Sequence, residues 1–597
     1  MTTLTPVHSL GTHARILLSG VFGPYAQNDE YGSRTINPME LYQNQVTRVQ
    51  GGFSLRMFHR SFGLMMIQSN LNAPCTLLDF PSLDRFVQEI RDNQYDIVGI
   101  SAIIPNVGKV KKMCELVREH LPGATIVIGG HIANKEELSE IIDADHIVKG
   151  EGVRWFQKFL GQNETEPIRH PLAYSAHGTR TLGLPLHREH QQGNTAAMLI
   201  PSVGCPVGCN FCSTSALFGG KGNFVNFYET GDALFAVMCD LEAKLKVTSF
   251  FVMDENFLLH RSRALRLMEL MASNQKSWSL YVFSSARVLQ SYTIDQLVGL
   301  GISWVWMGLE GQSSQYRKLR GVDTYELVQH LKSHGIRVLG SSIIGLEEHT
   351  PENIDQVIED AIRHDSDFHQ FMLYTPIPGT PLYDQHRKNG SLLSEAAFPL
   401  ADTHGQYRFN FHHPHIHQNR EEGFLLKAFQ RDFEVNGPSL ARLIRTLLTG
   451  WQRYKNHSDS RIRNRFAREA FPLRSVYAGA VWAMKTHYRN NRRLSEKLTR
   501  LLRDIYHEFG WGPKMMAPLI GRYLYITLKR EEKRLAKGWT YEPETFCEKN
   551  PAAIALENSA RNTARRRTGN VIGFKIDMTV RNIAETAKAA PVVPSSF

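Results

Sequence analysis

The chain has 597 residues, of which 42% are hydrophobic and 21% charged, and its net charge at pH 7 is +11. This composition is typical of a globular protein with roughly three or four domains. The sequence contains no apolar run of about eighteen residues, so we expect no membrane-spanning helix. The N-terminus lacks the basic start and apolar core of a secretory signal, and seven cysteines fit a reducing cytosol, so we expect a cytoplasmic protein.

The charge is divided unevenly along the chain. Residues 401–597 contain 35 Lys and Arg against 18 Asp and Glu, whereas the first 400 residues contain more acidic than basic side chains. A basic C-terminal region predicts an acidic partner, or peripheral contact with the inner membrane surface. No nucleic-acid-binding motif accompanies the charge, so we expect no nucleic acid as a partner.

Apolar strands and helices alternate between residues 14 and 160. Strands are expected within 14–20, 76–80, 96–102, 125–131 and 146–152. Continuous apolar strands separated by helices predict a doubly wound, Rossmann-like α/β domain over residues 1–160. A long irregular stretch that follows the first strand and ends near residue 60 is either a functional loop or a surface cover.

A doubly wound sheet binds ligands at the carboxyl ends of its strands, where glycine lets a bulky group approach the backbone. The candidate residues at these ends are Ser101, Asn106, Gly129, Gly130, His131, Gly150, Glu151 and Gly152. His131 could be a ligand, although a lone histidine is more often a polar residue with protein partners. No Gly-x-Gly-x-x-Gly pattern supports a dinucleotide.

Residues 161–195 are polar and interrupted by proline, which predicts a linker. A second alternation then begins, with strand–helix units starting near Met198, Ser249, Trp278, Ser303, Arg337 and Phe368. Six such units predict a partial (β/α)6 barrel over residues 196–385. In βα barrels the chemistry lies on loops at the carboxyl ends of the strands.

Three cysteines follow the first strand of this barrel. Cys205, Cys209 and Cys212 have C-x3-C-x2-C spacing in a loop rich in Gly and Pro. Thiolates favour an iron–sulfur cluster or zinc, and three ligands without a fourth nearby would leave one metal position open for chemistry. The motif alone leaves a zinc site or an electron-transfer centre as alternatives.

The cysteine spacing, with the aromatic Phe211 directly before the third cysteine, resembles the signature of the radical SAM superfamily. This resemblance implies that the three cysteines hold a 4Fe–4S cluster whose fourth iron binds S-adenosyl-L-methionine. The patterns at 96–101, 127–131 and 149–152 resemble the cobalamin-binding domain of one radical SAM subgroup. The chain has no Asp-x-His-x-x-Gly motif, so the resemblance implies a cobalamin without that axial histidine.

The resemblance also implies roles at later strand ends. Asp254 and Glu255 would hold the amino group of S-adenosyl-L-methionine, and Ser284 and Arg287 its ribose and carboxylate. A helix cap with an acidic first turn is the alternative for the two carboxylates, and a plain surface charge is the alternative for Arg287.

Two further strand ends belong to the same resemblance, which covers about residues 14–385. Glu310 ends an apolar run, and we expect it to bind a ligand because a buried carboxylate is costly unless it is paired or ligand-bound. Ile344 either packs on the adenine of S-adenosyl-L-methionine or is plain core.

Residues 386–420 form a connector that contains five histidines. Four of them flank Pro414 and one lies earlier in the segment: His412, His413, His415, His417 and His404. Their alternation in a loop predicts a solvated segment rather than a metal site. Helical spacing over 421–548, with Arg461, Arg465 and Arg530 between apolar stripes, predicts a mostly helical basic domain. Residues 549–597 are predicted to be a disordered tail.

Together with the resemblance, these features predict a cobalamin-dependent radical SAM enzyme. A 5′-deoxyadenosyl radical and methylcobalamin would methylate an unactivated carbon of a small-molecule or lipid-like substrate, with flavodoxin or ferredoxin as electron donor. One alternative is non-methylating chemistry with the same cofactors, such as cyclisation, ring rearrangement or C–C coupling. The other is a non-catalytic iron–sulfur or zinc protein whose basic domain binds a partner.

Overall fold

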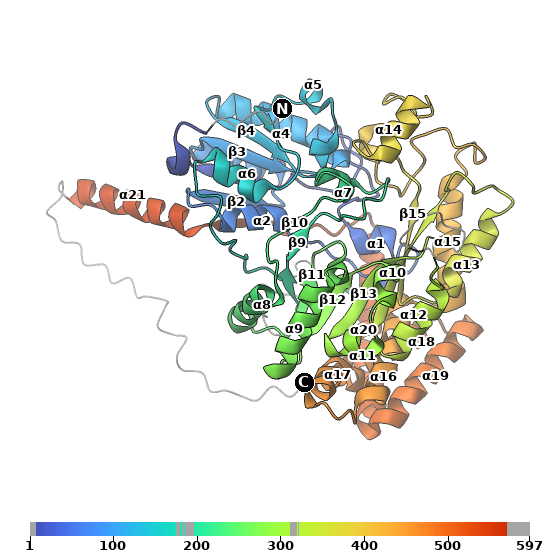
Figure 1. Ribbon diagram of the computed structural model, residues 1–597. Helices are drawn as coiled ribbons and strands as arrows, with labels where there is room; N and C mark the ends of the chain where they lie inside the picture. The colour runs from blue at the N-terminus through green and yellow to red at the C-terminus, as the bar shows by residue number, and fades with distance from the viewer. Residues whose placement is uncertain are drawn as a thin grey trace.

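A computed structural model describes residues 7–174, 196–310 and 321–569, together with Leu319 and the backbone of 180–181 and 184–185; beyond residue 561 only the backbone is described. An N-terminal α/β domain, a second α/β sheet and a group of C-terminal helices lie in that order from the top to the bottom of Figure 1. Most of the predicted linker at 161–195 lies outside the described residues.

The N-terminal sheet confirms the predicted parallel α/β domain. Its strand order is β16-β2-β1-β3-β4-β5, and strands β1 to β5 run parallel. Their bounds are β1 Ile16–Ser19, β2 Cys75–Asp79, β3 Ile97–Ser101, β4 Thr125–Gly129 and β5 His146–Ile147. Helices α3 (Leu83–Asp92) and α4 (Val107–His120) cover one face, whereas α2 (Phe62–Ser69) and α6 (Gly152–Phe159) cover the face toward the second sheet. Because both faces are covered, the strands are apolar along their length.

The C-terminal part of the chain returns to this domain. Strand β16 (Phe546–Lys549) pairs antiparallel with the edge strand β2. The buried Asn550 then accepts a hydrogen bond from the Cys75 amide at 3.0 Å. Sequence reasoning predicted disorder from residue 549, but helix α21 (Pro551–Gly569) follows the strand and projects from the domain in Figure 1. The four-residue strand is too short for its periodicity to reveal it.

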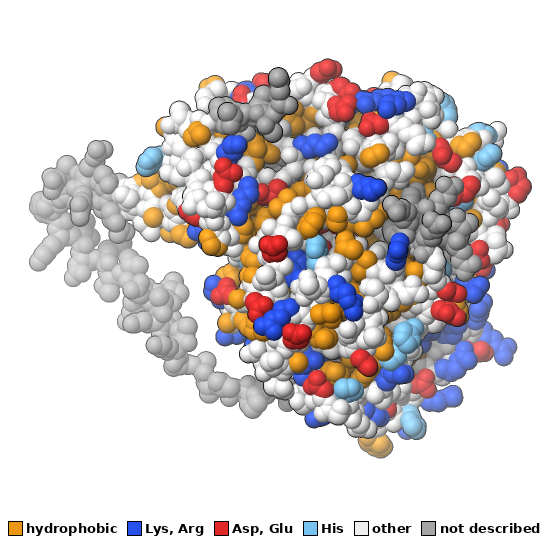
Figure 2. Space-filling view, in the orientation of Figure 1, with side chains coloured by type: hydrophobic (Ala, Val, Ile, Leu, Met, Phe, Trp, Pro, Cys, Tyr) orange, Lys and Arg blue, Asp and Glu red, His pale blue; other side chains and the backbone are white. Residues whose placement is uncertain are grey.

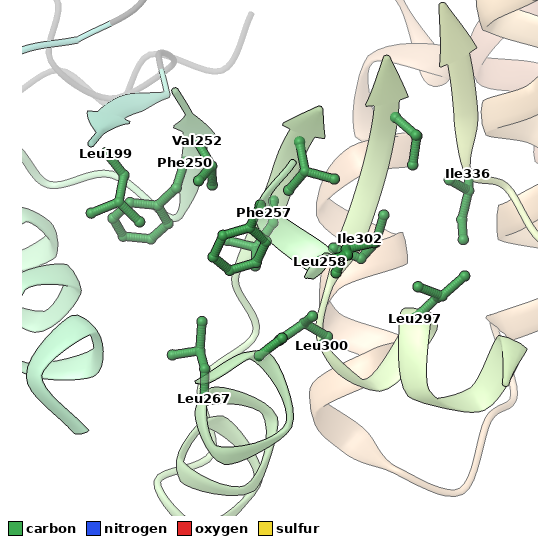
Figure 3. Packing of buried hydrophobic residues seen from close by; sticks show 14 of the residues in the cluster. Leu199, Phe250, Val252, Phe257, Leu258, Leu267, Leu297, Leu300, Ile302 and Ile336 are labelled. Carbon is green, nitrogen blue, oxygen red and sulfur yellow. The ribbon is translucent and has the colours of Figure 1, made fainter. Parts of the chain in front are cut away.

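Six parallel strands form the second sheet, in the order β15-β14-β13-β12-β11-β8, which confirms the six predicted units. Their bounds are β8 Ala197–Leu199, β11 Ser249–Val252, β12 Ser279–Phe283, β13 Ile302–Gly308, β14 Arg337–Ile344 and β15 Phe368–Leu373. Alternate strand residues pack outward against α8 (Gly231–Leu245), α9 (Arg261–Ser273) and α11 (Ile294–Gly299). Figure 3 shows this packing around Phe250, Leu267 and Ile302. The other strand face is left for the interior of the partial barrel.

The irregular stretch before residue 61 crosses from the N-terminal domain to the barrel. Arg34 forms an ion pair with Asp402 at 2.6 Å, and Gln370 donates from Nε2 to Gln45 Oε1 at 2.7 Å. Helix α1 (Leu41–Gln45) contacts β15, the last barrel strand. These contacts support the interpretation of this stretch as a cover, and its continuation into α2 brings it to the cavity described below.

The C-terminal helices pack beside the barrel. They are α15 Glu421–Asn436, α16 Ser439–Tyr454, α17 Ser460–Ala470, α18 Val476–His487, α19 Arg492–Phe509 and α20 Trp511–Leu535. Glu469 of α17 bonds to Ser279 and Arg337 at the start of β12 and β14, whereas α15 packs near the carboxyl ends of β14 and β15. Arg461 donates to the Gly299 carbonyl at 2.6 Å, and Arg465 to the Val298 carbonyl at 3.2 Å. Both side chains are buried, so these two charges attach the helices to the barrel and do not face solvent. No described helix is long and apolar enough to cross a membrane.

The sequence predicted that all five connector histidines lie in a solvated loop, but this is wrong for two of them. His413 is buried, stacks on Phe409 and lies with Nε2 3.0 Å from the Leu346 carbonyl oxygen. His404 is buried as well, whereas His412 is exposed. Aromatic packing therefore decides which of these histidines meet solvent.

Candidate functional site

A cavity of about 500 Å³ lies between the two sheets, where the carboxyl ends of both sets of strands meet. Most of its lining is apolar and comes from both domains, including Leu18, Phe62, Ile67, Val127, Phe156, Ile200, Leu217, Phe218, Phe227, Met253 and Phe283. Figure 2 shows apolar side chains gathered along the junction between the N-terminal domain and the barrel. A large apolar cavity at a domain junction, with a few polar groups, is the usual form of a ligand site.

Seven of the eight candidate residues in the N-terminal domain line this cavity: Ser101, Gly129, Gly130, His131, Gly150, Glu151 and Gly152. The eighth, Asn106, is buried, with its Nδ2 atom 3.7 Å from the Met39 sulfur. Gly130 has a φ of +82°, and a Cβ there would lie 2.6 Å from the Ala102 carbonyl oxygen. A side chain at this position would therefore distort the turn that forms the cavity wall.

Two polar residues of the lining have protein partners. His131 Nε2 lies 3.1 Å from Thr214 Oγ1, a barrel residue, and burial lowers the pKa of the imidazole. The Glu151 carboxylate caps helix α6 by accepting the backbone amides of Val153 and Arg154, the latter at 2.9 Å. Burial raises the pKa of this carboxyl. His131 thus fits the description of a polar residue with a partner, and Glu151 positions the turn at the cavity edge.

The cysteine loop runs beside the cavity, from β9 (Ser202–Val203) to helix α7 (Ser213–Leu217). Cys212 caps that helix, because its sulfur accepts the Ser215 amide at 3.4 Å. Gly208, with a φ of +65°, is required in the loop, since a Cβ there would lie 2.4 Å from Lys221 Cα. The Gly-rich sequence is therefore a consequence of the tight path that brings three thiols together.

The N-terminal domain and helix α14 (Pro381–Lys388), which follows the last barrel strand, both hold this loop. Asn134 donates from Nδ2 to the Ser213 carbonyl at 3.0 Å, and the Leu382 amide donates to the Asn210 carbonyl at 3.0 Å. Residues far apart in sequence thus converge on the loop, which fixes its place relative to the cavity.

The three thiols share one electrostatic environment. Burial, together with the charges of Cys209, Cys212 and Glu255, raises the pKa of the Cys205 thiol to about 11. All seven cysteines are described, and they form no disulfide. The described residues include no three Cys, His, Asp or Glu side chains converged on a single ion.

Asp254 and Glu255, at the end of β11, both border the cavity but have different surroundings. Asp254 is buried in an ion pair with Arg263 at 2.7 Å and also bonds to the Ser202 hydroxyl. Burial raises the pKa of the Glu255 carboxyl to about 7, and its Oε2 atom accepts no hydrogen bond from a described residue. Of the predicted pair, Glu255 therefore retains an acceptor for a ligand.

Three other predicted binding residues follow β12 and β13, outside the cavity lining. Ser284 is buried and donates from Oγ to Asn256 Oδ1 at 3.1 Å. Arg287 is exposed on α10 (Ala286–Gln290), and Glu310 is buried with a φ of +32°. Their roles toward a ligand stay predictions.

Ile344 and Phe211 meet in one apolar cluster. Ile344, the last residue of β14, is fully buried against residues such as Phe371 and Phe409. Phe211 packs on the same cluster from the cysteine loop. This packing supports the core interpretation of Ile344, and it gives the aromatic residue before the third cysteine a structural task.

Sequence reasoning missed the wall that helix α2 contributes. Its run Phe62–Ile67 is apolar on nearly all sides, because one side packs on the sheet and another borders the cavity. An unusually apolar short helix after an irregular loop was the available signal. Phe218, Phe227 and Phe283 were missed because the sequence does not show which aromatic side chains face the junction.

Comparison with known proteins divides the chain where the structure does. The family described as B12 binding domain matches residues 53–160, and the Radical SAM superfamily matches residues 199–361. The first match covers four of the parallel strands of the N-terminal sheet, and the second runs from the end of β8 into α13 (Ile354–Arg363).

Three curated relatives match about half of the chain at low identity. An uncharacterized methyltransferase of Pyrococcus horikoshii is 24% identical over 332 residues, 50% of this chain and 71% of its own. The bacteriochlorophyllide d C-8(2)-methyltransferase of Chlorobaculum tepidum is 24% identical over 373 residues, 57% of this chain and 78% of its own. The anaerobic magnesium-protoporphyrin IX monomethyl ester cyclase of Rubrivivax gelatinosus is 23% identical over 348 residues, 51% of this chain and 60% of its own.

Proposed function

Because the chain joins a B12-binding domain to a radical SAM domain, it belongs to the cobalamin-binding radical SAM enzymes, and we propose that it methylates an unactivated carbon of a small-molecule or lipid-like substrate. The observation that carries this proposal is the cavity between the two domains, which borders the carboxyl ends of both sheets and adjoins the cysteine loop. The radical SAM domain makes the chain an enzyme, so the alternative of a non-catalytic metal protein falls away.

The residues present fit the three cofactors. Cys205, Cys209 and Cys212 would hold the 4Fe–4S cluster, and the unsatisfied Oε2 of Glu255 suits the ammonium group of S-adenosyl-L-methionine. The glycine-lined strand ends of the N-terminal domain offer backbone that a corrin ring can approach. When bound, these cofactors supply the radical and the methyl group.

The chain's own contribution is to position and enclose the reacting groups. Apolar side chains from both domains exclude water from the cavity, which protects reactive species from side reactions. The His131–Thr214 and Asn134–Ser213 contacts fix the N-terminal domain against the cysteine loop. They therefore fix the distance between the region proposed to bind cobalamin and the region proposed to bind the cluster. The substrate must reach this junction, and the aromatic wall of Phe218, Phe227 and Phe283 favours an apolar, flat one.

The function for which one relative is named supports an apolar substrate. The Chlorobaculum relative is named for the methylation of a bacteriochlorophyllide, a large and flat ring system. A reduced flavodoxin or ferredoxin remains our proposal for the electron donor, and contact with a membrane surface remains our proposal for the basic C-terminal helices.

Anaerobic reconstitution with S-adenosyl-L-methionine and cobalamin tests the proposal. We expect 5′-deoxyadenosine, S-adenosylhomocysteine and, with the right substrate, a product heavier by one methylene. Cys209→Ala should abolish formation of 5′-deoxyadenosine, whereas Cys239→Ala, a cysteine on α8 outside the loop, should retain it. Turnover that survives Cys209→Ala would disprove the cluster assignment.

Non-methylating radical chemistry is the second candidate, and the similarity to the Rubrivivax cyclase favours it. The two candidates differ in the fate of S-adenosyl-L-methionine. Formation of 5′-deoxyadenosine with a changed substrate but without S-adenosylhomocysteine would support cyclisation or rearrangement over methylation.

A further inference from the structure

Helix α20 (Trp511–Leu535) presents an apolar stripe to solvent. Its exposed large side chains are Trp511, Met515, Leu519, Tyr523 and Ile526, and Trp511 is 75% exposed. Steps of three and four residues place these side chains along one side of the helix over about 22 Å. A contiguous apolar stripe of this size on a surface marks an interaction site.

The opposite side of the same helix explains why it is ordered. Ala517, Gly521, Leu524 and Leu528 are buried, and α18 packs closely against the helix. Gly521 is required there, because a Cβ would lie 2.6 Å from the Trp482 ring. The exposed stripe is therefore rigidly held outward.

The charges around the stripe have one sign. Lys514, Arg522, Arg530 and Lys533 are exposed on α20, and none of them forms an ion pair with a described residue. Of the two acidic residues of the helix, Glu531 is buried and Glu532 pairs with Lys529 at 2.7 Å. The solvent side of α20 thus combines large apolar and basic side chains without an acidic one.

The stripe also extends beyond the helix. The 3-10 turn η8 (Phe471–Arg474) contacts α20 and exposes Phe471, and Val476 at the start of α18 is exposed as well. Arg474 lies in the same turn, with its guanidinium 5.2 Å from the centre of the Phe509 ring. Two segments therefore contribute to one apolar and basic surface.

We propose that this surface, formed by the solvent side of α20 with Phe471 and Val476, docks on an anionic lipid bilayer. Tryptophan and tyrosine beside leucine and methionine suit the boundary between headgroups and acyl chains, and the interspersed lysine and arginine suit anionic headgroups. A second copy of the chain fits less well, because a two-fold interface would set like charges against each other without an acidic partner. The inference does not depend on methyl transfer, and lipid binding is measured apart from turnover.

The test is flotation of the purified full chain, with its cluster reconstituted, on two kinds of vesicle. One kind contains phosphatidylcholine alone and the other phosphatidylcholine with phosphatidylglycerol at 3:1. We expect binding to the anionic vesicles that falls at high salt and is several-fold weaker on neutral ones. Arg522→Glu should weaken binding at least about fivefold, since each basic residue near an anionic surface contributes on the order of that factor.

A matched pair of leucine variants tests whether lipid binding depends on this surface or on any exposed apolar side chain. Leu519→Glu should abolish flotation, whereas Leu426→Glu, an exposed leucine on α15, should bind like the unmodified chain. Iron content and far-ultraviolet circular dichroism confirm that each variant is folded. Equal binding to both vesicle types, or equal effects of the two leucine variants, would overturn the proposal. A dimer in light scattering that Leu519→Glu dissociates would overturn it too, in favour of a second copy.

Discussion

Asp254 offers a sharp test, because the structure and the family resemblance give it different tasks. In the structure its carboxylate lies 2.7 Å from the Arg263 guanidinium, and both side chains are at most 3% exposed. Asp254→Asn keeps the volume, so it opens no cavity, but it leaves the Arg263 cation buried among neutral groups. Removing one partner of a buried ion pair costs about 3–5 kcal/mol. That loss is a large fraction of the roughly 5–15 kcal/mol by which a domain is stable.

Urea unfolding of the apo chain, followed by circular dichroism, measures this loss as a lower midpoint. The double variant Asp254→Asn with Arg263→Met removes the orphaned cation, so we expect it to recover part of the stability that the single variant lost. Binding of S-adenosyl-L-methionine to the reconstituted chain is measured by calorimetry in parallel. If Asp254→Asn left the unfolding midpoint unchanged and abolished that binding, the residue would be a ligand of S-adenosyl-L-methionine and the structural argument would be refuted.

Three further predictions concern the cysteine loop, pH and the C-terminal strand. Gly208→Ala should lose most of its iron on reconstitution because the new Cβ would meet Lys221 at 2.4 Å, whereas Gly222→Ala, with a similar φ but open space, should retain it; equal iron in both would contradict the steric argument. His349 Nδ1 accepts the Gly345 and Leu346 amides at 3.0 and 3.2 Å, and burial lowers the pKa of its imidazole to about 4. The unfolded chain takes up a proton on this imidazole near pH 6.5, whereas the folded chain does so only near pH 4. The contribution of His349 to the stability of the folded chain is therefore complete above pH 6.5 and is lost as the pH falls toward 4. His349→Asn should reduce the difference between the urea midpoints at pH 7 and pH 5. An unchanged difference would show that His349 does not cause this pH dependence. Asn550→Ala should cost about 1–3 kcal/mol in the same assay, because the Cys75 amide and the Ala73 carbonyl lose a buried partner; a neutral effect would mean that β16 is held by other contacts.

Local patterns predicted the larger part of the fold. The alternation of apolar strands and helices predicted both parallel sheets, since strands covered on two faces must be apolar along their whole length. The spacing of Cys205, Cys209 and Cys212 predicted a single metal centre, because ligands close in sequence stay close in any fold. The strand ends at Gly129–Gly152 predicted one side of the cavity for the same reason.

Side-chain partners were beyond these patterns. Asp254 and Glu255 look alike in sequence, and only the approach of Arg263 from α9 separates a paired carboxylate from one with an open acceptor. Arg461 and Arg465 look like solvated charges on an amphipathic helix, yet they are buried against backbone carbonyls of the barrel. Burial of a charge depends on which elements meet, and that is decided by long-range packing.

Local sequence patterns were enough to predict two α/β domains, three cysteines gathered in one loop at the start of the second, and a basic helical region after it. Three features became visible only in the folded chain: the two sets of strand ends face one another across a cavity, β16 returns to the first sheet, and α20 turns its apolar and basic side to solvent. Periodicity and motif spacing report on neighbours within a few residues. Cavities, ion pairs and exposed faces arise between segments hundreds of residues apart, and no local pattern carries that information.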